Sequence, residues 1–560
     1  MRGFDIKLRL LFLPALLALT LGAFNADDRM LKKASEAITG AAYRAHVEGL
    51  ASDELLGREP GSEGERKTIE YIEKEYLELG LQPAAGGDFR QDVALVEITG
   101  SGQTLSFRRG GGGMELSYGD DMVIGSRRVQ PQASLAGSEV VFVGYGIHAP
   151  EAGWNDYAGI DMRGKTALIL VNDPGFVTGD ESLFRGRAMT YHGRWTYKFE
   201  EASRQGAAAA IIVHETAAAS YDWGVVRNSW SGPQFYLDSE DGNAGRTALE
   251  GWITEGRARQ LMELAGQDFD TLKSAAVKRG FTPVALGVSA TAGVRNEIRH
   301  KRSPNVAGLI PGKDRPDEYV IYMAHWDHLG TDGSGEGDRI YNGAVDNATG
   351  AAGILTIAKA YRDMLPGASR SVLFLAVTAE ESGLLGSEFY AEHPLVPIEK
   401  TAAVINIDAL NPLGRARDLE VVGFGASDLE DLLAEAAKSR SRILVPDLKP
   451  EAGRFYRSDQ FNFAKAGVPS LYVKSGTTLR DAPDGTGKAL LDDFEARRYH
   501  KPGDEYSGDW DVSGSVEDLR LLFEVGARVA NDTSWPAWRE GNEFAPAREK
   551  SAKSREPARD

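Results

Sequence analysis

The 560-residue chain is 42% apolar and 26% charged, a globular composition that indicates two or three domains and excludes wholesale disorder. Its formal net charge of −18 argues against a nucleic-acid partner, because a polyanion would be repelled. The chain contains no cysteine, which excludes disulfides, thiolate metal sites, iron–sulfur clusters and cysteine nucleophiles.

Residues 1–23 have the pattern of an export signal. Basic residues precede an apolar run over 10–21, and the small residues Gly22 and Ala23 follow it. The run is shorter than the ~20 residues that span a bilayer, and no later stretch is long and apolar enough to do so. We therefore expect a signal peptide and a periplasmic or secreted protein with no stable membrane anchor after signal removal. An uncleaved N-terminal anchor is the alternative.

The segment 27–136 is expected to begin with a helix and continue with short strands. Apolar residues recur at helical spacing from Ile69 to Leu79, and Ser62 stands three residues before Glu65 as in a capping box. Residues 94–123 alternate loosely and include four consecutive glycines at 110–113. They predict short strands and turns.

The segment 137–290 changes character and predicts a smaller, compact α/β module. Apolar runs over 139–144, 166–171 and 207–213 are of strand length, and a helix-like stretch over 200–205 separates the last two. The histidines of this segment are scattered, and we find no catalytic constellation in it.

The segment 291–536 repeats a strand, a loop and a helix. Strands are predicted over 319–324, 371–378 and 402–407, and a helix over 350–365. Buried strands that alternate with helices predict an α/β fold with a mostly parallel central sheet flanked by helices. The last residues, 537–560, are charged and show no period, so we expect a disordered tail.

Polar residues follow the ends of the predicted strands of this segment. Because open α/β sheets bind ligands at the carboxyl ends of their strands, these residues should meet at one edge. Carboxylates that share a pocket repel one another unless cations neutralise them, and imidazole nitrogen with carboxylate oxygen suits zinc. The residues are His325 and Asp327 after the first strand, Asp346 before the helix, Glu380 and Glu381 after the second strand, and Asp408 after the third.

A second histidine ligand is expected from elsewhere in the chain. His500 is the best candidate, because it sits in a loop before Pro502. His393 and His328 are the alternatives.

The motif set resembles the co-catalytic dizinc aminopeptidases and glutamate-carboxypeptidase-like metallopeptidases. The residues that match in order are His325-x-Asp327, Gly343-Ala344-x-Asp346-Asn347, Glu380-Glu381, Asp408 and Tyr499-His500-x-Pro502. The stretch 50–64, with Gly57-Arg58, resembles the N-terminal edge of the family's catalytic domain. The module 137–290 resembles the protease-associated domain inserted in extracytoplasmic members.

The resemblance implies a centre of two Zn²⁺ ions and assigns a ligand to each matching position. Asp346 would bridge the two ions. His325 and Asp408 would complete one site, and Glu381 and His500 would complete the other.

The resemblance also implies the catalytic roles. Glu380 would be the general base. Asp327 would orient the imidazole of the ligand His325, as such ligands usually require. Tyr499 would donate a hydrogen bond to the developing oxyanion, with Tyr456 as a rival for this role.

The expected function is that of an exported zinc aminopeptidase acting on peptide substrates. A carboxypeptidase or dipeptidase of the same superfamily is the first alternative, and Arg454 or Arg457 could then read the substrate carboxylate. A single-zinc aminoacyl cyclase and a non-catalytic binding protein on the same fold are further alternatives. The sequence indicates no oligomeric state.

Overall fold

The structure is a computed structural model that describes residues 29–333 and 337–555. The predicted signal peptide at 1–23 lies outside the described residues. Among the residues described, no helix combines the length and the apolar character needed to cross a bilayer.

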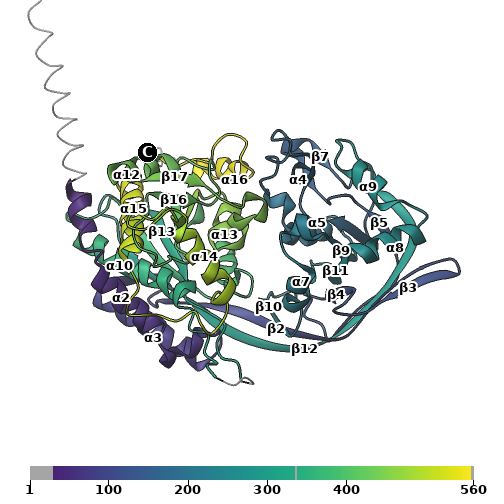
Figure 1. Cartoon of the computed structure of the whole chain (residues 1–560), viewed down its shortest axis with the longest axis horizontal. Helices are drawn as coiled ribbons and strands as arrows, with labels where there is room; N and C mark the ends of the chain where they lie inside the picture. Colours follow the sequence, from purple (N-terminus) through teal and green to yellow (C-terminus); the bar gives the residue numbers. More distant parts are fainter. Residues whose placement is uncertain (1–28, 334–336, 556–560) are drawn as a thin grey trace, which may run out of the picture.

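Two long antiparallel strands, β2 (Arg90–Arg109) and β12 (Val284–Ile310), join a larger and a smaller lobe, as Figure 1 shows. The prediction of short strands over 94–123 is wrong here, because β12 offers β2 a partner along its whole length and the pairing shifts only between Gly293 and Arg295. The glycine turn predicted at 110–113 is present, since β2 turns there into β3 (Gly112–Leu116).

The central sheet of the larger lobe is mostly parallel, as predicted. Four neighbouring strands run in parallel, in the order β14 (Arg370–Val377), β13 (Arg315–His325), β15 (Thr401–Asn406) and β18 (Ser470–Ser475). β12 borders β14 in the antiparallel sense, with the short β1 (Gln82–Pro83) beside it. β16 (Asp418–Val421) borders β18 in the antiparallel sense, and β17 (Ile443–Pro446) lies parallel to β16.

Helices cover both faces of this sheet because alternate residues of each strand point to opposite sides. On β14, Phe374 belongs to one apolar core and Leu375 to another. The first face is covered by α2 (Gly40–Leu50), α3 (Glu63–Glu78), α10 (Thr349–Asp363), α12 (Leu429–Ser439) and α15 (Ser513–Asn531). The second face is covered by α11 (Leu385–Glu392) and α13 (Gln460–Lys465). The Ser62 hydroxyl caps α3 by accepting from the Glu65 N–H at 3.2 Å.

The sheet continues through β12 into the smaller lobe, where β5 (Gln132–Phe142) pairs with β12 in the antiparallel sense. The strands β8 (Thr166–Leu170), β9 (Ala209–His214) and β11 (Leu249–Thr254) follow parallel to β5, with antiparallel β4 (Met122–Gly125) at the edge. The helices of this lobe are α4 (Pro174–Thr178), α5 (Trp195–Arg204), α6 (Thr216–Ala219), α7 (Trp223–Ser229), α8 (Glu255–Leu264) and α9 (Phe269–Ala276). The strands β6 (His148–Ala149) and β7 (Trp154–Asn155) pair separately. The apolar core of this lobe includes Leu105, which precedes residue 137, and Val294, which follows residue 290. The lobe therefore extends beyond the expected boundaries at 137 and 290.

Among the described residues, the two lobes touch in several places. Near α5, the Met189 N–H donates to the Pro450 carbonyl at 3.1 Å, and the ring of Tyr191 packs on that of Phe461. Strand β10 (Pro233–Leu237) leaves the smaller lobe to pair with β2, and its Phe235 packs near Ala379 of the larger lobe. The smaller lobe therefore supports the segment that carries Glu380.

The expectation of a disordered tail is wrong over 537–555. Helix α16 (Ala545–Lys550) forms there, and Trp538, Phe544 and Arg548 are buried. The Trp538 indole N–H donates to the Gly467 carbonyl at 3.0 Å, and Arg548 donates to the Thr401 carbonyl at 2.9 Å. Only a few widely spaced side chains hold the segment against the rest of the lobe. Its sequence therefore shows no helical or strand period.

Trp538→Ala tests whether this segment belongs to the folded protein. Removing the buried indole leaves a cavity and an unpaired Gly467 carbonyl, so we expect a loss of about 3–5 kcal/mol in the free energy of unfolding. Urea unfolding followed by circular dichroism measures it. Lys550→Ala, at an exposed site of the same segment, is the control. Equal stability of both variants would show that the segment does not contribute.

Candidate metal centre

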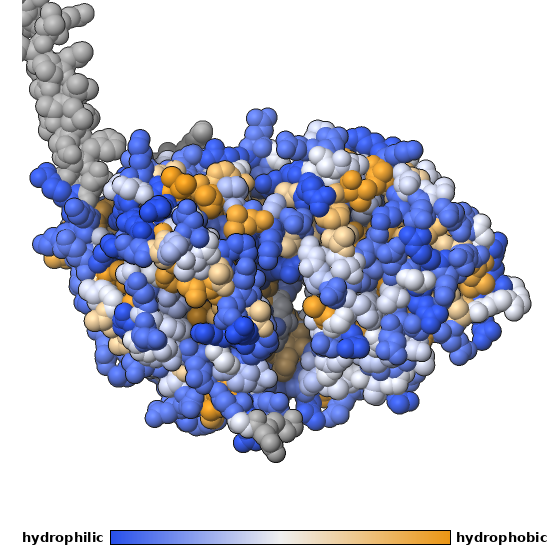
Figure 2. Space-filling model, viewed as in Figure 1, coloured by the Kyte–Doolittle hydropathy of each residue, from blue (hydrophilic) through white to orange (hydrophobic). Residues whose placement is uncertain are grey.

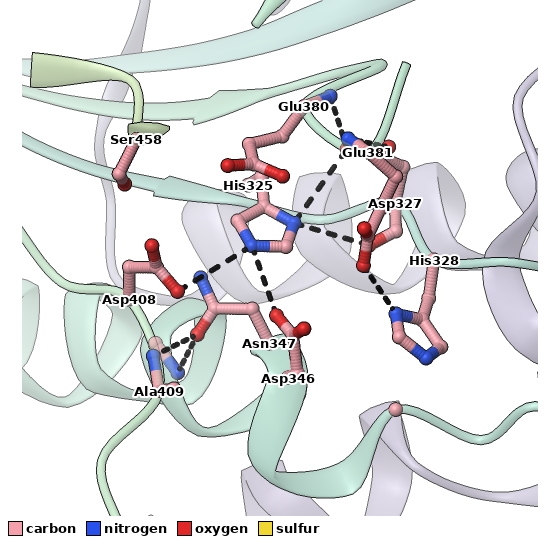
Figure 3. Close-up of polar contacts among 12 residues, drawn as sticks. His325, Asp327, His328, Asp346, Asn347, Glu380, Glu381, Asp408, Ala409 and Ser458 are labelled. Atoms are coloured by element: carbon pink, nitrogen blue, oxygen red, sulfur yellow. Dashed lines mark hydrogen bonds and ion pairs between the residues drawn. The ribbon is translucent and has the colours of Figure 1, made fainter. Parts of the chain in front are cut away.

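The predicted site residues meet at the carboxyl edge of the parallel strands. β13 ends at His325, while Glu380 and Glu381 lie in the loop after β14. Asp408 follows β15, and Asp346 lies in a turn at the start of α10. Four separate chain segments therefore bring their side chains to one place, as Figure 3 shows.

The Asp346 carboxylate stands between two histidines. Its Oδ1 lies 3.3 Å from His325 Nε2, and its Oδ2 lies 3.1 Å from His500 Nε2. His500 Nε2 is also 3.1 Å from Glu381 Oε2, and His325 Nε2 is 3.8 Å from Asp408 Oδ1. Each histidine thus faces Asp346 and one further carboxylate, in the pairing that the resemblance implies.

The donor set fits zinc. The carboxylates of Asp346, Glu381 and Asp408 are at most 13% exposed, and imidazole nitrogens complete the set. Burial alone would raise the pKa of Asp346, but His325 and His500 hold this pKa well below its usual range. Charge pairs between histidine and carboxylate thus join the members of the cluster.

Asp327 connects the loop of His325 with the loop of the two glutamates. Its carboxylate accepts from the N–H of Glu380 at 3.1 Å and from that of Glu381 at 3.3 Å. Asp327 Oδ1 also lies 3.7 Å from His325 Nδ1. Burial raises the pKa of Asp327 to about 6. Asp327 thus fixes two backbone segments at once, besides lying beside the imidazole.

Arg58 and Asp504 hold the backbone around the site. The buried Arg58 guanidinium donates to the Trp326 carbonyl at 2.8 Å and to the Gly343 carbonyl at 2.9 Å. The Asp504 carboxylate accepts from the N–H of Val345 at 2.9 Å and from that of Asp346 at 3.0 Å. Arg58 falls within the stretch 50–64 and Asp504 lies two residues after Pro502, but sequence reasoning assigned neither of them a role.

Asp408 has two partners that sequence reasoning missed. The Tyr472 hydroxyl donates to Asp408 Oδ2 at 3.1 Å, and the Lys474 ammonium donates to the Asp408 carbonyl at 2.8 Å. Burial alone would raise the pKa of Asp408, but the charge of Lys474 and then His325 lower this pKa to about 2. Both partners lie on β18, next to β15, so adjacency in the sheet was the signal that the linear sequence lacked.

The alternative histidines have different places. His328 is fully buried and its Nδ1 lies 2.7 Å from Glu381 Oε1, opposite the Glu381 oxygen that faces His500. His328 Nε2 has no hydrogen-bond partner among the described residues. His393 is exposed and lies against Phe389 at the end of α11, and it does not join the cluster.

The two candidate tyrosines differ in what their hydroxyls contact. The Tyr499 ring stacks on the His500 ring with centroids 4.0 Å apart, and Tyr499 is 44% exposed. The buried Tyr456 hydroxyl donates to Glu543 Oε1 at 2.6 Å. Of the two candidates, Tyr499 is therefore the partly exposed one beside the cluster, whereas the hydroxyl of Tyr456 is committed to Glu543.

Comparison with known proteins finds similarity within the larger lobe. Residues 305–523 match the model of Peptidase family M28. The mouse aminopeptidase NAALADL1 is 34% identical over 137 residues, which are 23% of this chain and 17% of that protein. The Caenorhabditis elegans glutamate carboxypeptidase 2 homolog is 28% identical over 200 residues, 34% of this chain and 24% of that protein. The chain thus spans a quarter or less of the length of these two relatives.

Two further matches are longer. A probable zinc metalloprotease of Pyricularia oryzae is 31% identical over 289 residues, 45% of this chain and 55% of that protein. Among solved structures, the aminopeptidase from Aneurinibacillus sp. strain AM-1 covers 90% of this chain and 96% of its own chain, at 19% identity and a TM-score of 0.49.

Asp504→Asn tests the support of the Asp346 loop. The amide nitrogen would face two backbone N–H groups, so Asp346 would lose its fixed position and the affinity for zinc should fall about 10- to 100-fold. Competition with a zinc chelator measures this affinity. Asp509→Asn, at an exposed position of the same loop, is the control. Unchanged zinc affinity in Asp504→Asn would contradict the assigned role.

Proposed function

We propose that this chain, which carries a peptidase domain of family M28 over residues 305–523, is an exported zinc aminopeptidase that removes N-terminal residues from peptides. The observation that supports this most strongly is the Asp346 carboxylate, which lies within 3.3 Å of His325 on one side and of His500 on the other. A carboxylate shared in this way suits a pair of cations.

The chain's own residues would hold two zinc ions in two sets. Asp346 would serve both ions, with His325 and Asp408 completing one set and Glu381 and His500 the other. When bound, two zinc ions lower the pKa of a shared water and polarise the scissile carbonyl.

Glu380 is the general base in this proposal. Burial raises the pKa of Glu380 well above its usual range, and the Glu381 carboxylate adds to the rise against the opposing charge of His325. A carboxylate in this position can accept a proton from water and pass it to the leaving amine. Asp327 fixes the backbone N–H of Glu380, which keeps the base in position.

Tyr499 is proposed to stabilise the carbonyl oxygen as it gains negative charge. Its ring is held against His500, and its exposure leaves the hydroxyl accessible to a substrate. Tyr456 is a poorer candidate because its hydroxyl is committed to Glu543.

The smaller lobe is proposed to be a protease-associated domain, and export is proposed from the signal pattern over 1–23. A carboxypeptidase or dipeptidase activity is the alternative, supported by the relative named glutamate carboxypeptidase 2 homolog. Of the two arginines considered as carboxylate readers, Arg454 is paired with Glu420 and Asp447. Arg457 has no such pair among the described residues.

Glu380→Gln tests the proposed base. The amide keeps the size of the side chain but cannot accept the water proton, so we expect kcat on aminoacyl p-nitroanilides to fall about 10²- to 10⁴-fold. The zinc content should stay that of the wild type, because Glu380 is not a proposed ligand. Steady-state kinetics and elemental analysis measure the two quantities.

Glu392→Gln, at an exposed position on α11, is the matched control. Removal of zinc by a chelator should abolish the wild-type activity, and added zinc should restore it. Full activity in Glu380→Gln, or after complete zinc removal, would refute the mechanism.

A further inference from the structure

His328 is the buried histidine that neither proposed zinc set uses. It closes the segment 325–328, which begins at the last residue of β13. Its side chain is 0% exposed and lies beneath the surface that Figure 2 draws, whereas the side chain of His500 is 38% exposed. A side chain without exposed surface does not meet a substrate arriving from solvent. Any role of His328 must therefore act through the neighbours that it touches.

The neighbour that His328 holds is one oxygen of the Glu381 carboxylate. His328 Nδ1 lies 2.7 Å from Glu381 Oε1, a contact that Figure 3 draws. Two lone pairs would repel each other at this separation, so Nδ1 carries a hydrogen and donates it to the carboxylate. The other oxygen, Glu381 Oε2, faces His500 Nε2 at 3.1 Å. The two oxygens of Glu381 therefore have different partners.

The far nitrogen of the ring agrees with this direction of donation. His328 Nε2 is buried and has no hydrogen-bond partner among the described residues. A neutral imidazole carries one hydrogen. With that hydrogen on Nδ1, the ring leaves only an acceptor unpaired at Nε2 and buries no unpaired N–H group.

The backbone around His328 fixes the place of its ring. The His328 N–H donates to the Arg58 carbonyl at 3.3 Å. A Cβ atom at Gly343 would lie only 2.5 Å from Cγ and Cδ2 of the ring, and Gly343 has a φ of 53°, which favours glycine. The ring thus packs directly on the backbone of the loop that carries Asp346, while its Nδ1 reaches Glu381.

Direct binding of zinc is the alternative role for His328, because atoms of His328, Asp346 and Glu381 lie within 4.8 Å of one another. His500 Nε2, however, meets both carboxylates, at 3.1 Å each. Within the described part of the chain, His328 Nδ1 pairs with Glu381 alone. His500 therefore fits the position of a ligand, and His328 fits that of a residue that holds a ligand.

We propose that His328 is a positioning residue of the zinc centre: it engages Glu381 Oε1 and so leaves Oε2 as the single oxygen with which Glu381 binds its ion. The inference rests on the proposed two-zinc centre. A carboxylate that binds through one oxygen takes one coordination position, and a catalytic zinc ion needs a position left open for water. Hydrogen bonds to ligating carboxylates also strengthen metal binding.

The segment 325–328 would then serve both zinc sets. His325 belongs to one set as a ligand, and His328 acts on the other set through Glu381. Asp327, between them, accepts from the backbone N–H of Glu381 at 3.3 Å. Backbone and side chain of Glu381 are thus held by two consecutive residues.

The test compares His328→Asn with His328→Leu, two side chains of nearly equal size and shape. Asparagine offers an N–H group at the place of Nδ1, and leucine offers none. Competition with a zinc chelator measures the affinity for each of the two ions in the full-length protein. The more weakly held ion should bind about 10- to 100-fold less tightly in His328→Leu than in the wild type, and within about threefold of the wild type in His328→Asn.

Packing alone predicts the opposite order of the two variants. A buried amide without all its partners costs free energy, whereas leucine is common in protein interiors. Thermal unfolding of the zinc-free proteins should therefore find His328→Asn no more stable than His328→Leu. Tighter zinc binding by His328→Asn then reports the hydrogen bond to Glu381 and not the filling of the site.

A second pair and a control complete the experiment. His328→Gln and His328→Met repeat the comparison of donor and non-donor with longer side chains, so the test stands even if His328→Leu does not fold. His393→Leu, at an exposed histidine outside the cluster, is the matched control and should bind zinc as the wild type does.

The outcomes separate this role from the zinc centre itself. Equal zinc affinity in the wild type and both variants would overturn the role of His328. An equal loss in His328→Asn and His328→Leu would overturn it too, because the ring itself would then be what zinc binding needs. Both results leave the two-zinc centre intact. A wild-type chain that binds fewer than two zinc ions would contradict the centre, and the role of His328 with it.

Discussion

The structure depends on the crowding of carboxylates at the edge of one sheet. Asp346, Glu381 and Asp408 lie within reach of two histidines, with Glu380 beside them. Such a cluster is stable only when positive charge offsets its repulsion. The shared position of Asp346 makes the cluster a single unit, because displacing this carboxylate would disturb both histidines. The proposed metal pair and the proposed chemistry both rest on this one arrangement.

Buried charged groups fix the loops that carry the cluster. Arg58 binds the carbonyl groups of Trp326 and Gly343, and Asp504 binds the N–H groups of the Asp346 loop. Asp327 does the same for the loop of the two glutamates. These contacts join segments that are far apart in the sequence. The ligands are thus held by backbone contacts as well as by one another, which is a form of preorganisation.

The sequence was informative where the physical signal is local. The buried strands of the larger lobe and the helix α10 are apolar runs with clear periods, and the candidate ligands follow directly after them. The carboxyl edge of a parallel sheet then brought His325, Asp346 and Asp408 together as predicted. Ser62 capped its helix because that contact spans only three residues.

The sequence was uninformative where the signal comes from a distant partner. Pairing with β12 makes β2 one long strand, although its own residues suggest turns. Tyr472 and Lys474 reach Asp408 only because β18 lies beside β15. Trp538 and Arg548 order a charged segment through a few long-range contacts. None of these effects leaves a period in the sequence.

The two lobes have separate apolar cores, and aromatic rings of both lobes meet where they touch. The most direct test of the central claim is the zinc stoichiometry of the purified protein and of Asp346→Asn, measured by elemental analysis after dialysis. The account predicts two zinc ions per wild-type chain and the loss of both tight sites in the variant. A single zinc ion in the wild type, or two retained in Asp346→Asn, would contradict it.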